Sequence, residues 1–149
     1  MILRWLVTTV HLLALPLGLG AVWARSRSLT SARNTGDLAR VFVADNLWAL
    51  AAGLWIVTGL WRAFGGLEKG TDYYLNNRVF YVKMGLLALI LLLEIWPMPT
   101  LIRWRIAARR GTAIDLTSAP VFARISQLQA ALVVLMVFAA TALARGFFY

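Results

Sequence analysis

Several ionisable or amide side chains lie inside long apolar stretches of this 149-residue chain, where they are candidates for chemistry. A charged side chain at bilayer depth costs at least a few kcal/mol, so each one needs a partner or a function. His11 and Lys83 are expected at the same level of the membrane, where together they would hold a cofactor or a substrate. The other side chains form a predicted interior polar cluster, which comprises Asp45, Asn46, Glu94, Arg124 and Gln127, with Gln129 beside them.

His11 is the only histidine of the chain, and cysteine is absent. Zinc and copper sites need several ligands in one place, so no metal site made of protein ligands alone is predicted. Haem b is different, because a single histidine can supply an axial ligand to its iron. Three roles therefore stay open for His11: an axial haem ligand, a proton-relay group, or a neutral imidazole that is hydrogen-bonded between helices.

The charged members of the polar cluster allow two interpretations. Asp45, Glu94 and Arg124 are expected to form an ion pair that closes one end of a helix bundle. Alternatively, Asp45 and Glu94 combine with Lys83 in a small proton-coupled transporter. Lys83 and Glu94 are eleven residues apart in the sequence, which places them on one helical stripe about 16 Å apart.

Four apolar segments must position these side chains. The composition, 61% hydrophobic and only 14% charged, excludes an ordinary soluble domain. The segments run from about 2–24, 41–61, 79–102 and 120–144, each close to the roughly 20 residues that a membrane-spanning helix needs. Because hydrocarbon offers no hydrogen bonds to a backbone, only helices are plausible here. The sequence predicts an all-α, integral membrane four-helix up-down bundle that forms a single transmembrane domain over 1–149.

Small residues at helical spacing predict which faces of the first two segments pack against protein. His11 and Asp45 belong to these faces, so both are expected to point into the bundle. A Trp-Pro-Met-Pro stretch at 96–99 is expected to kink or end the third helix, because proline lacks a backbone donor. The two predicted seams are His11, Ala14, Gly18 and Ala21, and Asp45, Ala49, Ala52 and Gly59.

The net charge of +9 comes from short clusters of Arg and Lys between the apolar segments. This placement is typical of membrane topology, and it does not favour nucleic acid as a partner. The positive-inside rule puts loops 25–40 and 103–119 in the cytoplasm and both termini on the periplasmic side. The predicted partner is the lipid bilayer, and a larger membrane complex or a homo-oligomer stays open.

Five stretches carry a resemblance to known proteins: TVHLLA at 9–14, ADNLW at 44–48, WIVTGLWR at 55–62, FYVK at 80–83 and EIWPM at 94–98. Through them, the whole chain resembles a bacterial family of predicted membrane proteins known as domain of unknown function 2214. This resemblance implies a multi-pass protein of the bacterial inner membrane. The family carries no established activity, so the resemblance implies no enzymatic reaction.

A looser likeness extends to HemJ-type protoporphyrinogen oxidases and to copper-resistance D-like membrane proteins. HemJ-type proteins bind haem b and place a histidine in helix one and a lysine at the start of helix three, where His11 and Lys83 stand here. The likeness implies a haem b or porphyrin site at these two residues. The aromatic-Pro-Arg-Leu pattern that follows helix one in the oxidases is missing from this chain, so their activity is not predicted.

The leading prediction for function is therefore a small membrane subunit or assembly factor with a polar bundle interior. The alternatives are a haem b or porphyrin-binding redox protein with His11 as axial ligand, and a small proton-coupled transporter that uses Lys83, Glu94 and Asp45.

Overall fold

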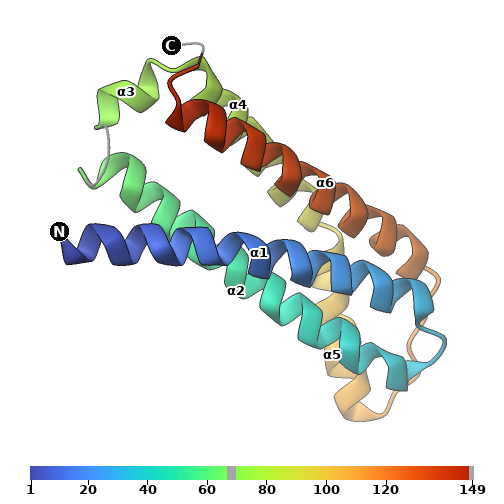
Figure 1. The fold of residues 1–149 in the computed structure, drawn as a ribbon. Coiled ribbons are helices and arrows are strands. Elements are labelled where there is room, and N and C mark those ends of the chain that lie inside the picture. The colour runs from blue at the N-terminus through green and yellow to red at the C-terminus, as the bar shows by residue number, and fades with distance from the viewer. Residues whose placement is uncertain (67–69, 148–149) are drawn as a thin grey trace.

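The computed structural model describes residues 1–66 and 70–147, and it folds this part of the chain into a set of helices (Figure 1). It is 85% helical and shows no strand among the described residues, which confirms the predicted all-α class. The elements are α1 (Ile2–Ser31), η1 (Thr35–Asp37), α2 (Leu38–Phe64), α3 (Thr71–Leu75), α4 (Arg78–Glu94), α5 (Pro97–Arg110) and α6 (Ala119–Ala144).

Four helical segments of the described chain are long and apolar enough to cross a membrane. They are α1, α2 together with η1, α4 together with α5, and α6. Backbone groups are paired within each helix, as hydrocarbon surroundings require. The four segments confirm the prediction of a membrane bundle with four spans.

The first helix is longer than predicted. It continues to Ser31 instead of ending near Ala24, because no glycine or proline interrupts the chain between Gly20 and Gly36. Arg25 is therefore a helical residue and does not belong to the first loop, where the sequence places it. This difference decides the composition of the interior site described below.

The third predicted helix, 79–102, is divided in two. α4 ends at Glu94 and α5 begins at Pro97. Neither Pro97 nor Pro99 can donate a backbone hydrogen bond to the preceding turn, so the helix breaks where the sequence predicts a kink or an end. The break lets α5 run in a different direction from α4 (Figure 1).

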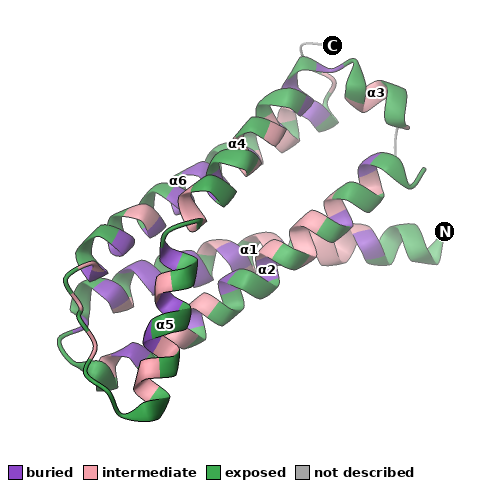
Figure 2. Ribbon diagram, turned by 180° about the vertical axis from the view of Figure 1, so that it is seen from behind, coloured by how far each residue is buried: buried purple, intermediate pink, exposed green. Residues whose placement is uncertain are grey.

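The four long helices form two pairs. α1 packs along α2, α4 packs along α6, and α1 also contacts α6. Both termini and α3 lie at one end of the bundle, here called the termini end, whereas η1 and α5 lie at the other, here called the α5 end (Figure 1). The two pairs are close together toward the α5 end and diverge toward the termini end in both views (Figures 1 and 2).

Buried residues follow the inside of the bundle, and the outside is largely exposed (Figure 2). The outside also carries large apolar side chains, such as Leu135 at 51% and Phe138 at 69% exposure. Soluble proteins rarely expose many such side chains together, whereas lipid accommodates them. The buried clusters include Leu29, Leu38, Leu101 and Phe122 at the α5 end, Val22, Trp48, Ile90 and Val133 in the middle, and Val79, Phe80 and Leu143 near the termini end.

The predicted seam of α1 is largely buried, whereas that of α2 is correct at its two ends, where Asp45 bonds Arg25 and Gly59 lies against His11, but not at Ala49. Gly18 is buried, and a Cβ added to it would lie 3.2 Å from the Cβ of Ala51, so the two helices approach closely at this glycine. In α2, Trp48 and Ala51 face inward, whereas Ala49 is exposed. The seam through Ala49 is therefore wrong, because Trp48 and not its neighbour fills the space beside α1.

Candidate functional site

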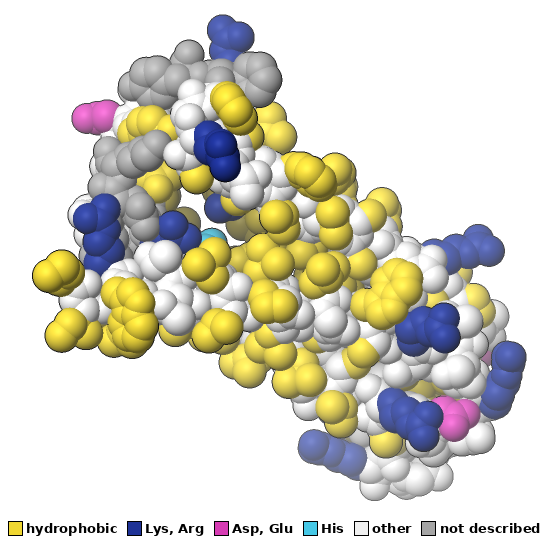
Figure 3. Space-filling model, viewed as in Figure 1, with side chains coloured by type: hydrophobic (Ala, Val, Ile, Leu, Met, Phe, Trp, Pro, Cys, Tyr) yellow, Lys and Arg dark blue, Asp and Glu magenta, His cyan; other side chains and the backbone are white. Residues whose placement is uncertain are grey.

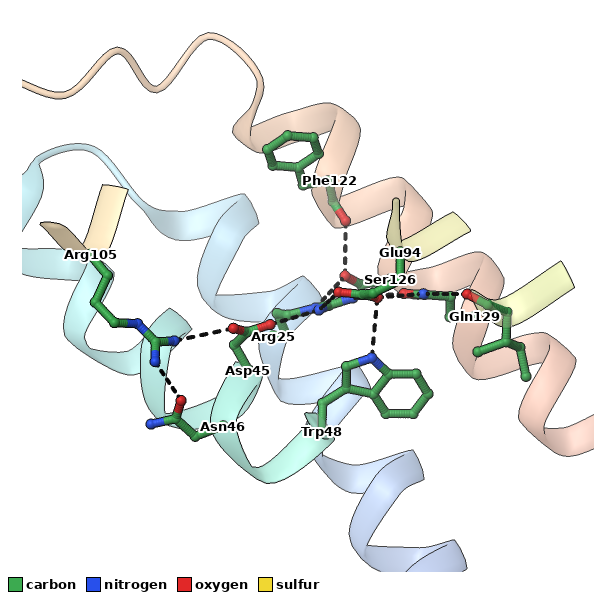
Figure 4. Close-up of polar contacts among 10 residues, drawn as sticks. Arg25, Asp45, Asn46, Trp48, Glu94, Arg105, Phe122, Ser126 and Gln129 are labelled. Atoms are coloured by element: carbon green, nitrogen blue, oxygen red, sulfur yellow. Dashed lines mark hydrogen bonds and ion pairs between the residues drawn. The ribbon is translucent and has the colours of Figure 1, made fainter. Parts of the chain in front are cut away.

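Arg25, near the end of α1, is completely buried at 0% exposure. A guanidinium has five N–H donors, and each of those of Arg25 meets an acceptor from another helix (Figure 4). Its Nε donates to Ser126 Oγ at 3.0 Å, and Nη1 donates to Asp45 at 2.9 Å. Glu94 accepts from both terminal nitrogens at 2.7 and 3.0 Å, and Gln129 Oε1 accepts from Nη2 at 2.7 Å.

Glu94, the last residue of α4, is the main counter-charge of Arg25. Besides the guanidinium, it accepts a hydrogen bond from Gln129 Nε2 at 2.7 Å and one from the indole nitrogen of Trp48 at 3.2 Å. The Trp48 ring also lies 5.9 Å from the Arg25 guanidinium carbon, as in a cation–π contact. Glu94 is thereby held by side chains from α1, α2 and α6.

Arg105 extends these contacts to α5. Its Nη2 donates to the second oxygen of Asp45 at 3.1 Å, and its Nη1 donates to Asn46 Oδ1 at 2.6 Å. Its guanidinium carbon lies 5.1 Å from the centre of the Phe42 ring. The Arg25 network therefore contains two arginines and two carboxylates, which balance in charge, and it comprises Arg25, Asp45, Asn46, Trp48, Glu94, Arg105, Ser126 and Gln129.

The structure brings together some members of the predicted polar cluster and not others. Asp45, Asn46 and Glu94 lie in the Arg25 network, but Arg124 and Gln127 are exposed. The ion pair expected for Arg124 is formed by Arg25 and Arg105 instead. The physical reason is helical phase, because the face of α6 that meets α1 carries Phe122, Ser126, Gln129 and Val133.

Arg25 and Arg105 are the two charged members of the network that the sequence does not predict, and Trp48 and Ser126 are likewise outside the predicted cluster. A signal for Arg25 is present, since it continues the 3-4 spacing of Ala14, Gly18 and Ala21 by four residues. The apolar segment ends before it, however, and a basic residue at that place reads as part of a loop. Arg105 gives no such signal, because the direction of α5 depends on the break before Pro97.

The Arg25 network is suited to positioning helices. It is not suited to catalysis, because its charged groups are already engaged with one another. Every N–H of the guanidinium is used, and both carboxylates are engaged by arginines. Its side chains come from α1, α2, α4, α5 and α6, so it joins the two helix pairs at the level where they converge (Figure 4). A buried ion pair that is fully hydrogen-bonded specifies one arrangement of the elements that carry it.

His11 lies away from the Arg25 network, on the half of α1 nearer the termini end. Its Nδ1 is 2.8 Å from the Thr58 hydroxyl of α2. That hydroxyl donates its only hydrogen to the carbonyl of Leu54, so it accepts the hydrogen of His11 Nδ1. The neutral ring therefore keeps a lone pair on Nε2.

The packing of α2 allows the imidazole to lie close to the backbone. A Cβ added to Gly59 would stand 3.3 Å from His11 Cε1, a distance tighter than most real contacts. The ring of Trp55 is next to it, with ring centroids 6.2 Å apart. Thr58, Gly59 and Trp55 thus fix the position of the imidazole, and its Nδ1 hydrogen bond fixes its orientation.

A hollow opens between the diverging helix pairs, and the histidine side chain is visible at its inner end beside Lys or Arg side chains (Figure 3). Two cations act electrostatically on His11: Arg62 of α2 and Lys83 of α4. Lys83 is half-buried and forms no hydrogen bond or ion pair with any residue in the described part of the chain. The charges of Lys83 and Arg62 thus act on His11 from α4 and α2, and the region around the imidazole is here called the His11 hollow.

Comparison with known proteins gives one match. The family described as "Predicted membrane protein (DUF2214)" matches residues 3–147, which is nearly the whole chain. No curated protein and no solved structure matches the chain.

Proposed function

Because the chain belongs to this family of predicted membrane proteins, whose role is unknown, we propose that it is a membrane-embedded binding protein. In this proposal the Arg25 network holds the α5 end rigid, and the His11 hollow at the other end receives the ligand. The division follows the course of the helix pairs, which join at one end and diverge at the other (Figure 1).

One observation carries the proposal: the imidazole of His11 keeps a lone pair on Nε2, and the charge of Lys83, which has no hydrogen bond or ion pair among the described residues, acts on it. An intramembrane lysine without a partner among the described residues is costly, and a bound anion would remove that cost. A ligand that carries both an acidic group and a metal ion open to a nitrogen donor would pair with Lys83 and bind His11.

Haem b fits these requirements. His11 Nε2 would supply the axial nitrogen, and Thr58, which orients the ring through Nδ1, acts as the outer partner that metal-binding histidines usually have. Lys83 would pair with a propionate, and the ring of Trp55 offers an apolar wall. When bound, haem would supply one-electron redox chemistry. The residues of this chain would bind it, orient it and shield it from water.

The same observations weigh against transport through the polar interior. Asp45 and Glu94 both form ion pairs with Arg25, so both carboxylates are engaged within the Arg25 network and not with Lys83. Lys83 lies near the His11 hollow, whereas Glu94 lies in the Arg25 network. The helical stripe predicted to carry both residues is therefore divided between two sites.

An absorbance spectrum tests the proposal. The purified protein, titrated with haem b in a mild detergent, is expected to develop a Soret band that His11→Ala abolishes. Lys83→Met should weaken haem binding without moving the band, since it removes a charge partner and leaves the axial nitrogen in place. Thermal unfolding of each variant checks that the bundle is intact. A folded wild-type protein that stays colourless at saturating haem would contradict the proposal.

A second candidate function, a small subunit or assembly factor of a larger membrane complex, is favoured by a groove on the outer side of α1 and α2. The groove has a volume of about 580 Å³. Exposed Gly20 and Ala24 line it, and the space beside Gly20 is open. Small residues four apart let a second membrane helix approach closely. The groove is thus suited to a helix of a partner subunit.

Co-purification in a mild detergent tests the subunit candidate. The wild-type protein is expected to elute in a larger complex, and Gly20→Leu with Ala24→Leu should release it by filling the groove. Gly85→Leu is the matched control, because Gly85 is an exposed glycine of α4 that also has open space beside it. A wild-type protein that elutes only as a single bundle would exclude this candidate.

For the topology, we keep the bacterial inner membrane with both termini periplasmic as part of the proposal. Nine arginines lie in or just beyond loops 25–40 and 103–119. Arg25 and Arg105 face the interior, so the positive bias toward the cytoplasmic side depends on the other seven. Since the chain has no cysteine, single cysteines introduced at Ser31 and Gly146 can be labelled from one side at a time. If Gly146→Cys is labelled only after the cells are opened, the C-terminal end lies in the cytoplasm and the proposed orientation is wrong.

A further inference from the structure

The outward side of α5 carries an apolar stripe. Met98, Ile102 and Ile106 are spaced four residues apart and are 53%, 49% and 44% exposed. The opposite side of the helix packs on the bundle through Leu101 and Trp104. The stripe therefore does not take part in the packing of α5 against the bundle.

Arginines stand beside this stripe. Arg103, Arg109 and Arg110 are all exposed, and α5 contains no acidic residue. The fourth arginine of the helix, Arg105, points inward and pairs with Asp45. The outward side of α5 thus combines an apolar stripe with unbalanced positive charge, which is the composition of a helix that lies in a membrane interface.

Within the candidate span formed by α4 and α5, α4 alone is long enough to cross most of the hydrocarbon core, which would leave α5 at the membrane surface. α4 has 17 residues, which at 1.5 Å per residue span about 25 Å, close to the roughly 30 Å of the hydrocarbon core. A helix that begins just beyond α4 and turns away from it therefore starts where the headgroups begin. There the stripe can enter the acyl boundary while the arginines reach the phosphates.

We infer that the outward side of α5 is a binding surface for anionic phospholipid headgroups. The arginines bind phosphate oxygens through charge-assisted hydrogen bonds, and Met98, Ile102 and Ile106 anchor the helix in the adjoining acyl region. Zwitterionic lipid offers the same apolar anchor but no net negative charge. The surface therefore distinguishes phosphatidylglycerol from phosphatidylcholine.

Lipid binding at this surface is coupled to the bundle interior through Arg105. Arg105 lies on the inner side of the same helix and joins Asp45 and Asn46 of α2. A headgroup bound to the outer arginines holds α5 in place, and α5 in turn holds Arg105 in the Arg25 network. Bound anionic lipid is therefore expected to stabilise the whole bundle. This inference stands apart from the proposed ligand of the His11 hollow.

Thermal unfolding of the full chain in a neutral detergent tests the inference. Added phosphatidylglycerol is expected to raise the melting temperature more than phosphatidylcholine does at equal concentration. Each arginine near a membrane surface contributes roughly a fivefold gain in affinity, so Arg103→Gln, Arg109→Gln and Arg110→Gln together should weaken the apparent affinity for phosphatidylglycerol by roughly a hundredfold. The double variant of the last turn, Arg109→Gln with Arg110→Gln, covers the case in which the triple variant does not fold.

The control is a second triple variant with the same loss of charge at the same end of the bundle. It replaces Arg27, Arg33 and Arg40, which are exposed and lie outside α5, by glutamine. This control should keep most of the affinity for phosphatidylglycerol. Equal loss in both triple variants would overturn the inference, because lipid would then respond to net charge alone. A stabilisation by soluble polyglutamate as large as that by phosphatidylglycerol would also overturn it, in favour of an acidic protein segment as the partner.

Discussion

Replacing Arg25 by methionine tests whether the Arg25 network holds the helix pairs together. Methionine keeps an unbranched apolar stem and removes the five hydrogen bonds of the guanidinium. Removing one partner of a buried ion pair costs about 3–5 kcal/mol of unfolding free energy. Asp45 keeps Arg105, and Glu94 keeps Trp48 and Gln129. We therefore expect a loss near the lower figure, about 3 kcal/mol.

Loss of helical circular dichroism on heating in one mild detergent measures this change. For a chain of this length, each kcal/mol shifts the melting temperature by roughly 2–4 °C, so Arg25→Met should melt roughly 6–12 °C lower than the wild type. The matched control is Arg27→Met, two residues further along the same helix and exposed. A surface change of this kind is expected to stay within about 0.5 kcal/mol of the wild type.

A double variant separates the ion pair from the space that it fills. Arg25→Met with Glu94→Met removes both charges, and apolar replacement of a whole buried pair is often close to neutral. The double variant should therefore melt higher than the sum of the two single losses predicts. Equal melting of Arg25→Met and Arg27→Met, or strict additivity in the double variant, would refute the reasoning that the network holds the bundle.

Three further changes test individual contacts. Trp48→Phe removes the indole hydrogen bond to Glu94 and should lower the unfolding free energy by about 1.5–3 kcal/mol, measured by the same heating experiment. Gly59→Ala should displace the His11 ring and lower stability by more than Gly53→Ala, because a Cβ at Gly53 meets open space; equal melting temperatures would contradict the close contact. Asn34→Ala breaks the capping box before α2 and should cost about 1 kcal/mol, seen as a lower melting temperature and faster amide exchange in the first turn of α2.

The sequence is sufficient to predict the four spans, because length and apolar composition alone identify a membrane-spanning helix. It also predicts the break after Glu94, since prolines act on the backbone locally. Local chemistry and hydrocarbon thickness are enough for these features.

The composition of the Arg25 network depends on information that is not local. Arg25 looks like a loop residue until the helix is known to continue past it, and Arg124 looks like a partner until the phase of α6 is known. Charge alone does not separate them, because both are arginines near the ends of apolar segments. Only the packed bundle shows that Arg25 faces two carboxylates while Arg124 faces outward.

The prediction that His11 and Lys83 lie at the same level comes from counting residues along each helix, and the structure adds the contacts of His11 with α2. Counting cannot show that Thr58 orients the imidazole or that Gly59 makes room for it. These contacts depend on the rotation of α2 against α1, which is set by packing around Trp48.

The order in which the chain is made gives Arg25 a further significance. Its partners Asp45, Glu94 and Gln129 follow it by 20, 69 and 104 residues. At roughly 5–20 residues per second, Gln129 leaves the ribosome roughly 5–20 s after Arg25. During that interval the arginine of α1 has no complete set of acceptors, and its long stem lets the charge stay at the membrane surface. The final depth of α1 is therefore reached only after α6 has been inserted, and a nascent chain that stops before α6 should hold its first helix in a shallower position.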